Sequence, residues 1–527
     1  MLRRPTFPLG PALLLAALAA VAMLTRPLTP IDETRYVGVA WEMWLRNEYL
    51  VLFKNGAPYS HKPPLLFWLY NLGWAVTGVN EWWPRLVSPL FSFGGLALTL
   101  SLARRLWPDD REAGRNAAWI LAASLLWMLF STSSMFDVML GFFALLGVRG
   151  LLVAADGSMK RGFAWLSVAI GFGVLAKGPV ILLHVLPAAV LAPWWRPGLA
   201  WRRWYGGILL ALLGGAAIAL AWAIPAAIHG GDEYRRMIFW GQTADRMVDS
   251  FAHRRPLWWY LPLLPLLLYP WLVWPALWRR LLALRAEGLD GGLRLCLAWM
   301  LPAFLAFSMI SGKQVHYLVP LFPAFALLAG RLVRPSTRGG TWLPSLLAAI
   351  TGAAMVYFAY AARPQEVATW QDFPAWPGMA LALAALLAGW LGRQPARRLP
   401  VLALLGAAVF VLIQLYVADN LWRRYDVRPI AAEIRKLQAR GLAVANHGDY
   451  HAQFQFAGRL ERPLEELETA GIPAWFDKHP DGAIVFYVQE RKASPAPALF
   501  RQPYRGESAE LLNAEQARAR GLLGASK

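Results

Sequence analysis

Residues 29–64 read TPIDETRYVGVAWEMWLRNEYLVLFKNGAPYSHKPP, and an apolar run, LGPALLLAALAAVAML, precedes them at residues 9–24. Such a run is close to the length that crosses the hydrocarbon core of a bilayer as a helix. The stretch that follows carries acidic, basic and histidine side chains, and further apolar runs come after it. Ionisable groups at membrane depth are costly and tend to be functional. Residues 29–64 are therefore predicted to form a functional loop of a membrane protein.

The composition supports a membrane protein. The chain has 527 residues, of which 57% are hydrophobic and 16% are charged, whereas a soluble domain averages about 25% charged residues. A membrane β-barrel would show alternating segments of about ten residues instead of long apolar runs. The sequence predicts a polytopic α-helical membrane protein with about thirteen transmembrane helices, at residues 9–24, 85–104, 116–132, 138–155, 162–178, 179–193, 206–227, 257–278, 293–310, 316–333, 342–362, 376–392 and 399–418.

The basic residues predict the orientation. A net charge of +20 would suggest a nucleic-acid partner in a soluble protein, but here the arginines gather in alternate short loops, as cytoplasmic loops require. No nucleic-acid partner is expected. In a bacterial inner membrane, the amino terminus is predicted to be cytoplasmic. The 26–84 and 228–256 loops and the tail are predicted to be periplasmic. The single cysteine, Cys296, excludes an intramolecular disulfide.

The tail differs from the rest of the chain. Residues 1–418 form the predicted transmembrane domain, and residues 419–527 are predicted to form a small periplasmic α/β domain. An amphipathic pattern begins at Arg428, and residues 442–445 and 483–488 have the composition of short buried strands. Residues 493–527 show only a weak pattern and are expected to end loosely.

Polar residues converge on the predicted outer face. Each has an ordinary explanation: the aspartates could cap helices, the lysines and the tyrosines could anchor at the interface, and the histidines could be solvated. The functional hypothesis rests on their occurring together. The candidate residues are Asp32, Glu33, Arg35, Tyr36, His61, Lys62, Asp137, Arg246, His253, Lys313 and Tyr317.

The motifs resemble a known superfamily. The sequence has DETRY at 32–36, HKPPL at 61–65, AKGP at 176–179, HRRPLWWYLP at 253–262 and GKQVHYLVPLFP at 312–323. Together with an aspartate before the fourth span, they resemble the bacterial aminoarabinose-transferase and protein-mannosyltransferase superfamily. The resemblance implies a GT-C glycosyltransferase that uses a polyprenyl-phosphate sugar. It covers the first ten spans well and the tail less specifically.

The resemblance also implies roles for individual residues. Asp32 and Asp137 match the acidic catalytic positions, and Glu33, Tyr36 and His61 lie in the donor and acceptor loop. The residues expected at the lipid phosphate are Arg35, Lys62, Arg246, Lys313 and Tyr317. The chemistry agrees, because cations stabilise the developing charge of a departing phosphate and a carboxylate can accept the proton of the acceptor. Single displacement with inversion at the anomeric carbon is expected.

The sequence departs from the aminoarabinose-transferase pattern at two places. His61 stands where these enzymes tend to have glutamate, and Gln242-Thr243 stands where they tend to have Glu-His. No cofactor is certain, but His61 and His253 could form a substitute zinc site, since imidazole suits zinc. The departures leave another sugar or another acceptor open.

The predicted function is transfer of a sugar from an undecaprenyl-phosphate donor to an envelope acceptor such as lipid A, on the periplasmic face. The partners are the polyprenyl-phosphate sugar, the lipid or glycan acceptor and membrane lipids. The alternatives are a protein O-glycosyltransferase of the same fold and a lipid or sugar transporter. A transporter would need ionisable residues along its spans and repeated halves, whereas these spans are almost bare of charge. A ligand sensor would not need the DETRY and HKPPL motifs.

Overall fold

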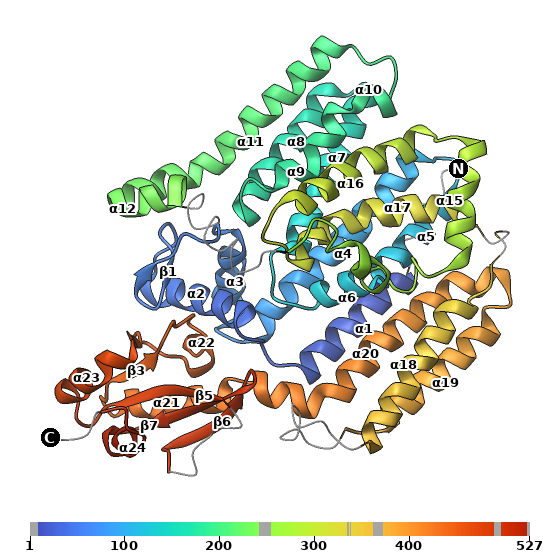
Figure 1. Cartoon of the computed structure of the whole chain (residues 1–527). Coiled ribbons are helices and arrows are strands. Elements are labelled where there is room, and N and C mark those ends of the chain that lie inside the picture. Colours follow the sequence, from blue (N-terminus) through green and yellow to red (C-terminus); the bar gives the residue numbers. More distant parts are fainter. Residues whose placement is uncertain are drawn as a thin grey trace.

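The computed structural model describes residues 9–241, 255–334, 337, 339–361, 373–489 and 497–523. These residues form a helical bundle with a small sheet domain at one end (Figure 1). Most of the predicted spans are helices. The main helices are α1 (Leu9–Thr25), α4 (Trp82–Leu106), α7 (Asp137–Ala155), α8 (Met159–Lys177), α11 (Trp201–His229), α16 (Gly291–Met309), α17 (Phe322–Leu332) with the preceding 3-10 turn η3 (Val315–Leu321), α18 (Trp342–Tyr360), α19 (Trp376–Leu391) and α20 (Arg398–Tyr425).

Among the described residues, eight helices are long and apolar enough to cross a membrane. A ninth span is possible if α5 (Arg111–Ala122) and α6 (Leu125–Ser131), which are bent by 66° against each other, count as one. Shorter apolar helices accompany them, at α1, α3 (Leu65–Thr77), α9 (Ile181–Val190) and α19. The predicted helical architecture is confirmed, but the count of about thirteen spans is not.

The bend between α5 and α6 interrupts the span predicted at residues 116–132. The backbone N–H of Leu125 donates to the carbonyl of Tyr269 at 3.3 Å, and the Ser124 hydroxyl donates to the carbonyl of Ile120 at 2.6 Å. A helix break at membrane depth is tolerated where protein groups satisfy the backbone. The break is therefore compatible with a buried position inside the bundle.

The span predicted at residues 257–278 is wrong as a continuous helix. Prolines cannot donate a backbone hydrogen bond and break helix interiors, and this run holds four of them, at 262, 265, 270 and 275. The chain instead makes short pieces that hydrophobicity alone does not predict. These are η2 (Leu261–Leu263), α14 (Leu264–Leu267) and α15 (Pro275–Glu287).

The loop between α1 and α4, which the sequence predicts on the outer face, is more ordered than the sequence suggested. It contains α2 (Asp32–Arg46), the short antiparallel pair β1 (Phe53–Lys54) and β2 (Ala57–Pro58), and α3. Helix α2 ends at Asn47, whose left-handed backbone (φ 52°) turns the chain. The loop is thus a folded cap on the end of the bundle (Figure 1).

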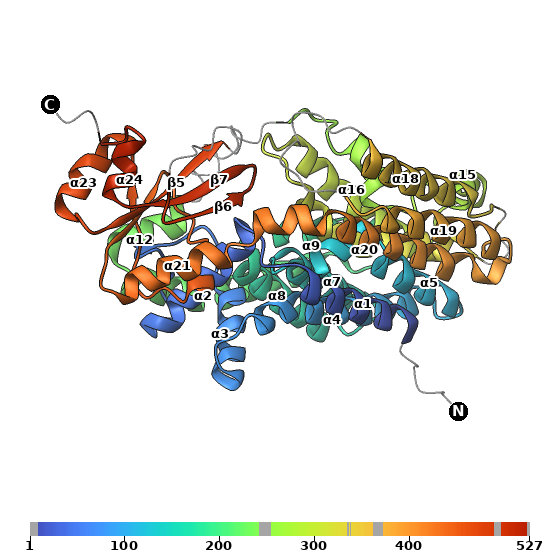
Figure 2. The same cartoon turned by 90° about the horizontal axis from the view of Figure 1, so that it is seen from below.

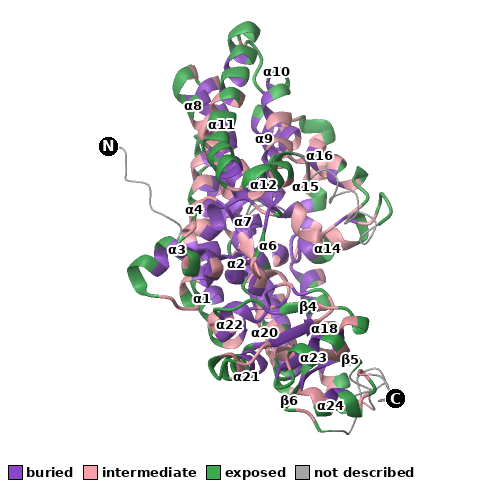
Figure 3. Ribbon diagram, turned by 90° about the vertical axis from the view of Figure 1, so that its left-hand side faces the viewer, coloured by how far each residue is buried: buried purple, intermediate pink, exposed green. Residues whose placement is uncertain are grey.

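Helix α7 lies at the centre of the bundle (Figure 3). It is the most deeply buried of the long apolar helices, because 83% of its apolar stretch is buried inside the protein. It packs closely on α8 through small residues. A Cβ added to Gly150 would lie 2.7 Å from the Gly162 carbonyl oxygen, and one added to Gly162 would lie 2.3 Å from the Ala154 nitrogen. Such small residues let membrane helices approach closely. As α7 and α8 are antiparallel neighbours, the start of α7 lies beside the end of α8.

The tail domain is a five-stranded mixed sheet of strand order β4-β3-β5-β7-β6. β4, β3 and β5 are parallel to one another, β7 pairs antiparallel with β5, and β6 pairs antiparallel with β7. The small α/β domain predicted from the sequence is present. Its elements are α21 (Arg428–Ala439), β3 (Val444–His447), α22 (Gln455–Gly458), β4 (Glu465–Leu467), α23 (Ile472–Lys478), β5 (Ala483–Gln489), β6 (Phe500–Tyr504), β7 (Glu507–Leu512) and α24 (Ala514–Ala519).

The sheet is covered on both faces. Val485 packs with Ile430 and Ile434 of α21, whereas its neighbour Ile484 packs with Trp475 of α23, as expected because successive strand residues point to opposite faces. The expectation of a loose end at 493–527 is wrong for residues 500–519. Strand β7 reads ESAELL and carries a glutamate in its buried centre, so it lacks the apolar pattern of an ordinary strand.

The tail domain lies at the end of α20 and docks on α2 (Figure 2). The indole of Trp41 donates to the carbonyl of Leu460 at 2.9 Å, and Phe456 stacks on Trp74 with ring centroids 5.3 Å apart. A Cβ added to Gly38 of α2 would lie 2.8 Å from the carbonyl oxygen of Ala452. The close packing fixes the sheet domain over the first outer loop.

We expect Phe456→Ala to undock the tail domain, because it removes a buried ring at the interface and costs about 3 kcal/mol. Limited proteolysis of the detergent-solubilised chain should show faster cleavage between α20 and α21. Phe358→Ala, which removes a 56% exposed ring of α18, is the matched control. Equal cleavage of both variants would contradict the docking contact.

Candidate active site

The first turn of α2 sends two consecutive carboxylates in different directions. Asp32 and Glu33 are one residue apart, which separates their directions by about 100° on a helix. Asp32 pairs with Arg35 and accepts a hydrogen bond from the Tyr36 hydroxyl at 3.2 Å. Asp32 is not the N-cap, since Ile31 holds that position and Asp32 is the first helical residue. Its carboxylate is partly open, with 46% of the side chain exposed.

Glu33 points into the protein. Its side chain is 4% exposed, and it pairs with Arg26 at 3.3 Å. It also accepts hydrogen bonds from the backbone N–H of Ser134 at 2.6 Å and of Thr29 at 3.0 Å. The Thr29 hydroxyl is a further donor. Glu33 thus joins the end of α1, the start of α2 and the turn before α7, and its place is structural, in contrast to the expected place in the substrate loop.

The second half of the loop brings Tyr59, His61 and Lys62 to the same side. Tyr59 is buried, and His61 is exposed and stacks on it with ring centroids 5.4 Å apart. The hydroxyl of Tyr59 has no hydrogen-bond partner among the described residues. Burial raises the pKa of Tyr59 to about 12, so the phenol keeps its proton and can donate it to a ligand. Arg35 and Asp32 lie within electrostatic range of Tyr59.

The start of α7 provides the second carboxylate. Asp137 is 1% exposed and pairs with Lys177, the last residue of α8. It does not cap α7, because Phe136 is the N-cap residue and makes no side-chain cap bond. The ammonium of Lys177 lies over the ring of Tyr317, 5.5 Å from its centroid. The packing of α7 against α8 and η3 therefore brings together an aspartate, a lysine and a tyrosine that are far apart in the sequence.

Lys62 lies between these groups. Burial, together with the charges of Lys177 and Arg35, lowers the pKa of Lys62 to about 8, and Asp32 and Asp137 act in the opposite direction. Three cations thus stand around two carboxylates in a mostly buried site. Because like charges repel strongly where water is scarce, the site is suited to receive an anion.

His316 of η3 lies within electrostatic range of Asp137, Lys177, Asp32 and Lys62. It stands edge-on to Tyr317, with ring centroids 4.8 Å apart. The segment that carries the GKQVHY motif therefore does reach the site, through its histidine and tyrosine.

Lys313 does not join this group. Its ammonium donates to the carbonyl oxygens of Ile310 at 2.5 Å and of Arg255 at 3.0 Å, so it holds the end of α16 against the chain before η2. Arg246 and His253 lie outside the described residues. For the expected zinc site, the residues that the structure describes contain no group of three or more His, Cys, Asp or Glu side chains that could hold a metal. The zinc site expected at His61 and His253 stays a prediction.

Four residues near the site are absent from the candidates drawn from the sequence. Lys177 and His316 lie inside the AKGP and GKQVHYLVPLFP motifs, whereas Tyr59 and His184 lie outside the quoted motifs. Tyr59 stands directly before the HKPP motif, and the only signal was that position. His184 of α9 is fully buried, and neither ring nitrogen has a hydrogen-bond partner among the described residues. It lies within electrostatic range of Lys177 and Asp137. A lone histidine in an apolar span was a usable signal, since ionisable groups in spans tend to be functional.

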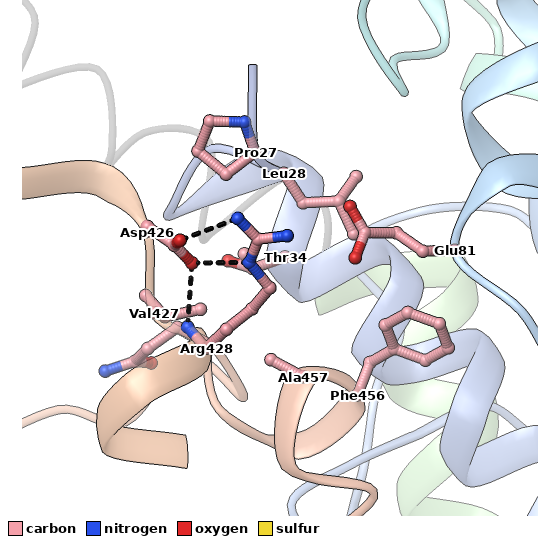
Figure 4. Close-up of a pocket in the computed structure, with 10 residues that line it drawn as sticks. Pro27, Leu28, Thr34, Glu81, Asp426, Val427, Arg428, Phe456 and Ala457 are labelled. Carbon is pink, nitrogen blue, oxygen red and sulfur yellow. Dashed lines mark hydrogen bonds and ion pairs between the residues drawn. The ribbon is translucent and has the colours of Figure 1, made fainter. Parts of the chain in front are cut away.

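A narrow cleft lies beside the site, between the start of α2 and the tail domain (Figure 4). Asp426 and Arg428 pair across one wall at 2.7 Å, and Phe456 lines the other. The cleft holds about 10 Å³, which is roughly the space of one water molecule. It is too small to take a sugar.

Comparisons with known proteins agree with this geometry. Residues 61–229 match the family described as dolichyl-phosphate-mannose-protein mannosyltransferase. A solved ArnT from Cupriavidus metallidurans, bound to undecaprenyl phosphate, superimposes with a TM-score of 0.72 at 20% identity, over 96% of this chain and 98% of that one. This chain therefore has the fold of that ArnT and resembles the aminoarabinose transferases. The predicted superfamily resemblance, the fold class and the multi-pass membrane character are thereby confirmed.

Curated relatives carry the same description. An undecaprenyl phosphate-alpha-4-amino-4-deoxy-L-arabinose arabinosyl transferase of Pseudomonas fluorescens Pf-5 is 31% identical over 64% of this chain and 63% of its own length. One of Pseudomonas aeruginosa UCBPP-PA14 is 32% identical over 55% and 52%, and one of P. fluorescens Pf0-1 is 28% identical over 83% and 78%. The chain therefore spans less than two thirds of the length of the first two.

Substitutions of the neighbouring residues Glu33 and Asp32 should differ in their effect on the stability of the protein. We expect Glu33→Gln to lower the free energy of unfolding by about 3 kcal/mol, because it leaves the Arg26 guanidinium buried without its counter-charge. Asp32→Asn should change stability little, as its carboxylate is partly exposed. Thermal unfolding of both variants in the same detergent measures the difference, and a Glu33→Gln protein as stable as Asp32→Asn would refute the structural role.

Proposed function

We propose that this protein is an integral membrane glycosyltransferase that moves a sugar from a polyprenyl phosphate, such as undecaprenyl phosphate, to an envelope acceptor such as lipid A. The observation that carries the proposal is the site in which Arg35, Lys62 and Lys177 surround Asp32 and Asp137. An excess of cations in a mostly buried site matches a phosphate ligand. The names of the curated relatives support the donor class.

In the proposed reaction, the acceptor hydroxyl attacks the anomeric carbon as the bond from that carbon to the phosphate oxygen breaks. Asp32 accepts the hydroxyl proton, and the polyprenyl phosphate leaves with the electron pair of the broken bond. Arg35 and Lys62 stabilise the charge that grows on the phosphate. Asp137 holds Lys177 in place for the same purpose, and inversion follows from the single displacement.

Arg35 can serve both halves of this reaction. It pairs with Asp32, and 23% of its side chain is exposed. Some N–H donors of its guanidinium group are therefore available to a ligand. A guanidinium has five donors in a planar fork. One edge of Arg35 therefore orients the carboxylate while another is open to the phosphate.

The acceptor is the less determined part. A protein acceptor is the second candidate, favoured by the match of residues 61–229 to a protein mannosyltransferase family. His61, exposed on the ring of Tyr59, is placed to contact the sugar or the acceptor at the edge of the site. A change there from glutamate to histidine alters the charge that meets the sugar, which supports a sugar other than aminoarabinose as an alternative.

We further propose that the site and the tail domain face the periplasm, with the amino terminus in the cytoplasm of a bacterial cell. The arginine-rich loops at the opposite ends of the helices support this orientation. A zinc ion at His61 and His253 would need further ligands, and no step of the proposed reaction uses one. Metal analysis of the purified chain, with His61→Ala as control, tests that expectation.

Asp32→Asn should reduce sugar transfer by about a hundredfold or more, because it removes the proposed general base. The assay uses membranes or purified protein with a polyprenyl-phosphate sugar, and mass spectrometry of lipid A and envelope proteins from expressing cells identifies the acceptor. Glu42→Gln is the matched control, since Glu42 lies on the same helix and pairs with Arg46 away from the site. Undiminished transfer by Asp32→Asn would exclude the proposed role of Asp32.

The pH profile should report Lys62. A lysine with a pKa of about 8 is cationic below that pH and neutral above it, so phosphate affinity should fall as the pH rises through 8. Because kcat/KM follows the free enzyme, kcat/KM for the donor should decline above this pH. Lys62→Arg should flatten the decline, since arginine stays charged. An identical profile for Lys62→Arg would contradict the assignment.

A further inference from the structure

A second polar hollow lies at the other end of the bundle, away from the site. It encloses about 540 Å³, a size that is typical of ligand pockets. Its walls come from the ends of α4, α7 and α17, the start of α16 and α10 (Ala192–Trp195). Arginines line it together with aspartates and two tryptophans, namely Arg105, Arg196, Arg331, Arg334, Asp109, Asp110, Asp156, Asp290, Trp107 and Trp195.

Helix α7 measures the separation of this hollow from the active site. The helix begins at Asp137, in the site, and ends at Ala155, in the wall of the hollow. Nineteen helical residues rise about 28 Å at about 1.5 Å each, which is close to the thickness of the hydrocarbon core. The hollow therefore lies at the opposite membrane surface. Trp194, which directly precedes the lining residues Trp195 and Arg196, is 42% exposed, as is typical of the membrane–water interface.

The carboxylates of the hollow hold the arginines in fixed positions. Asp156 pairs with Arg105 at 2.8 Å and with Arg196 at 3.2 Å. Asp110 pairs with Arg334 at 2.9 Å and also with Arg331, which reaches Asp290 at 3.1 Å. Asp110, Asp156 and Asp290 are thus engaged in ion pairs, while each guanidinium brings five donors. All four arginines line the hollow.

The rim arginines keep donors open. The side chains of Arg105, Arg196 and Arg334 are 37%, 52% and 46% exposed, and each ion pair of theirs above uses a single terminal nitrogen. Asp110 and Asp290 also accept backbone hydrogen bonds at the starts of α5 and α16. Fewer of their lone pairs are therefore available to the arginines. The hollow therefore has unused N–H donors, which can bind a hydrogen-bond acceptor and above all an anion.

We propose that this hollow binds the phosphodiester headgroup of a phospholipid from the leaflet opposite the active site. Guanidinium groups match phosphate oxygens in geometry and charge. The exposed Trp194 indicates that the rim of the hollow lies at the depth of the lipid headgroups. The fatty chains would lie along the apolar outer surface of the helices. The site does not depend on the proposed transferase reaction, because no residue is shared between the two.

The test measures lipid retention by the full-length chain purified in detergent. Native mass spectrometry with added phosphatidylglycerol should show a retained lipid, whereas diacylglycerol, which lacks phosphate, should not be retained. The double variant Arg196→Gln/Arg334→Gln should weaken retention by about tenfold or more, because it removes charged hydrogen bonds at the rim. Arg161→Gln/Arg397→Gln, which changes two exposed arginines that do not line the hollow, is the matched control and should retain the lipid.

Two further measurements distinguish lipid binding in the hollow from donor binding at the active site and from binding of free phosphate. Lys62→Gln should leave this retention unchanged, which separates it from donor binding at the active site. Inorganic phosphate at millimolar concentration should not displace the lipid. Equal retention by the Arg196/Arg334 variant and the wild type, loss of retention in Lys62→Gln, or displacement by free phosphate would each overturn the proposal. Sugar transfer by the Arg196/Arg334 variant should stay at the wild-type level, so failure of this inference and failure of the proposed function are distinguishable.

Discussion

The buried carboxylate of Glu33 is the contact on which the arrangement of the site depends. It pairs with Arg26 at the end of α1 and accepts the N–H of Ser134 in the turn before α7. Arg85 of α4 strengthens the same junction by donating to the carbonyl of Arg26 at 2.6 Å. A buried ion pair is stable only if its remaining donors and acceptors are largely satisfied, and here Ser133 and the backbone of Thr132, Ser134 and Thr29 bind all but the Nε of Arg26. Three segments are therefore held in one geometry, and the position of Asp32, the preceding residue in the chain, depends on that junction.

The same logic explains how the second carboxylate is placed. Asp137 belongs to α7 and Lys177 to α8, and the close approach at Gly150 and Gly162 brings these helices together. An acid at a helix start and a lysine at a helix end are each favoured by the helix dipole. The site thus uses positions that also suit the helices, which is why neither residue stands out by its local sequence. Only their pairing in space distinguishes them from ordinary helix-end charges.

The sequence allowed the helical class, the tail domain and the convergence of Asp32, Arg35, Lys62 and Asp137 to be predicted, since apolar runs and dense charge are local signals. It could not separate Glu33 from Asp32, because burial depends on which way a helix turns against its neighbours. Lys313 was misplaced for a related reason: its ammonium satisfies carbonyls at the end of α16, a need that only the folded chain reveals. The span at 257–278 was misjudged because hydrophobicity outweighed proline, and strand β7 was missed because its buried Glu510 breaks the apolar pattern.

The two polar regions of the protein differ in how far carboxylates compensate their positive charges. In the hollow at the far surface, carboxylates and guanidiniums are equal in number and lie near water, where each ion pair contributes little to stability. In the active site, cations exceed carboxylates and are mostly withdrawn from water, so their repulsion remains until an anion arrives. Burial, and to a lesser extent the charges of Lys177 and Arg35, lowers the pKa of Lys62 in this site. In the proposed reaction, a bound phosphate would relieve the repulsion among the cations. The relief would be larger for the doubly charged phosphate that departs than for the diester that enters, which would favour the transition state over the bound donor.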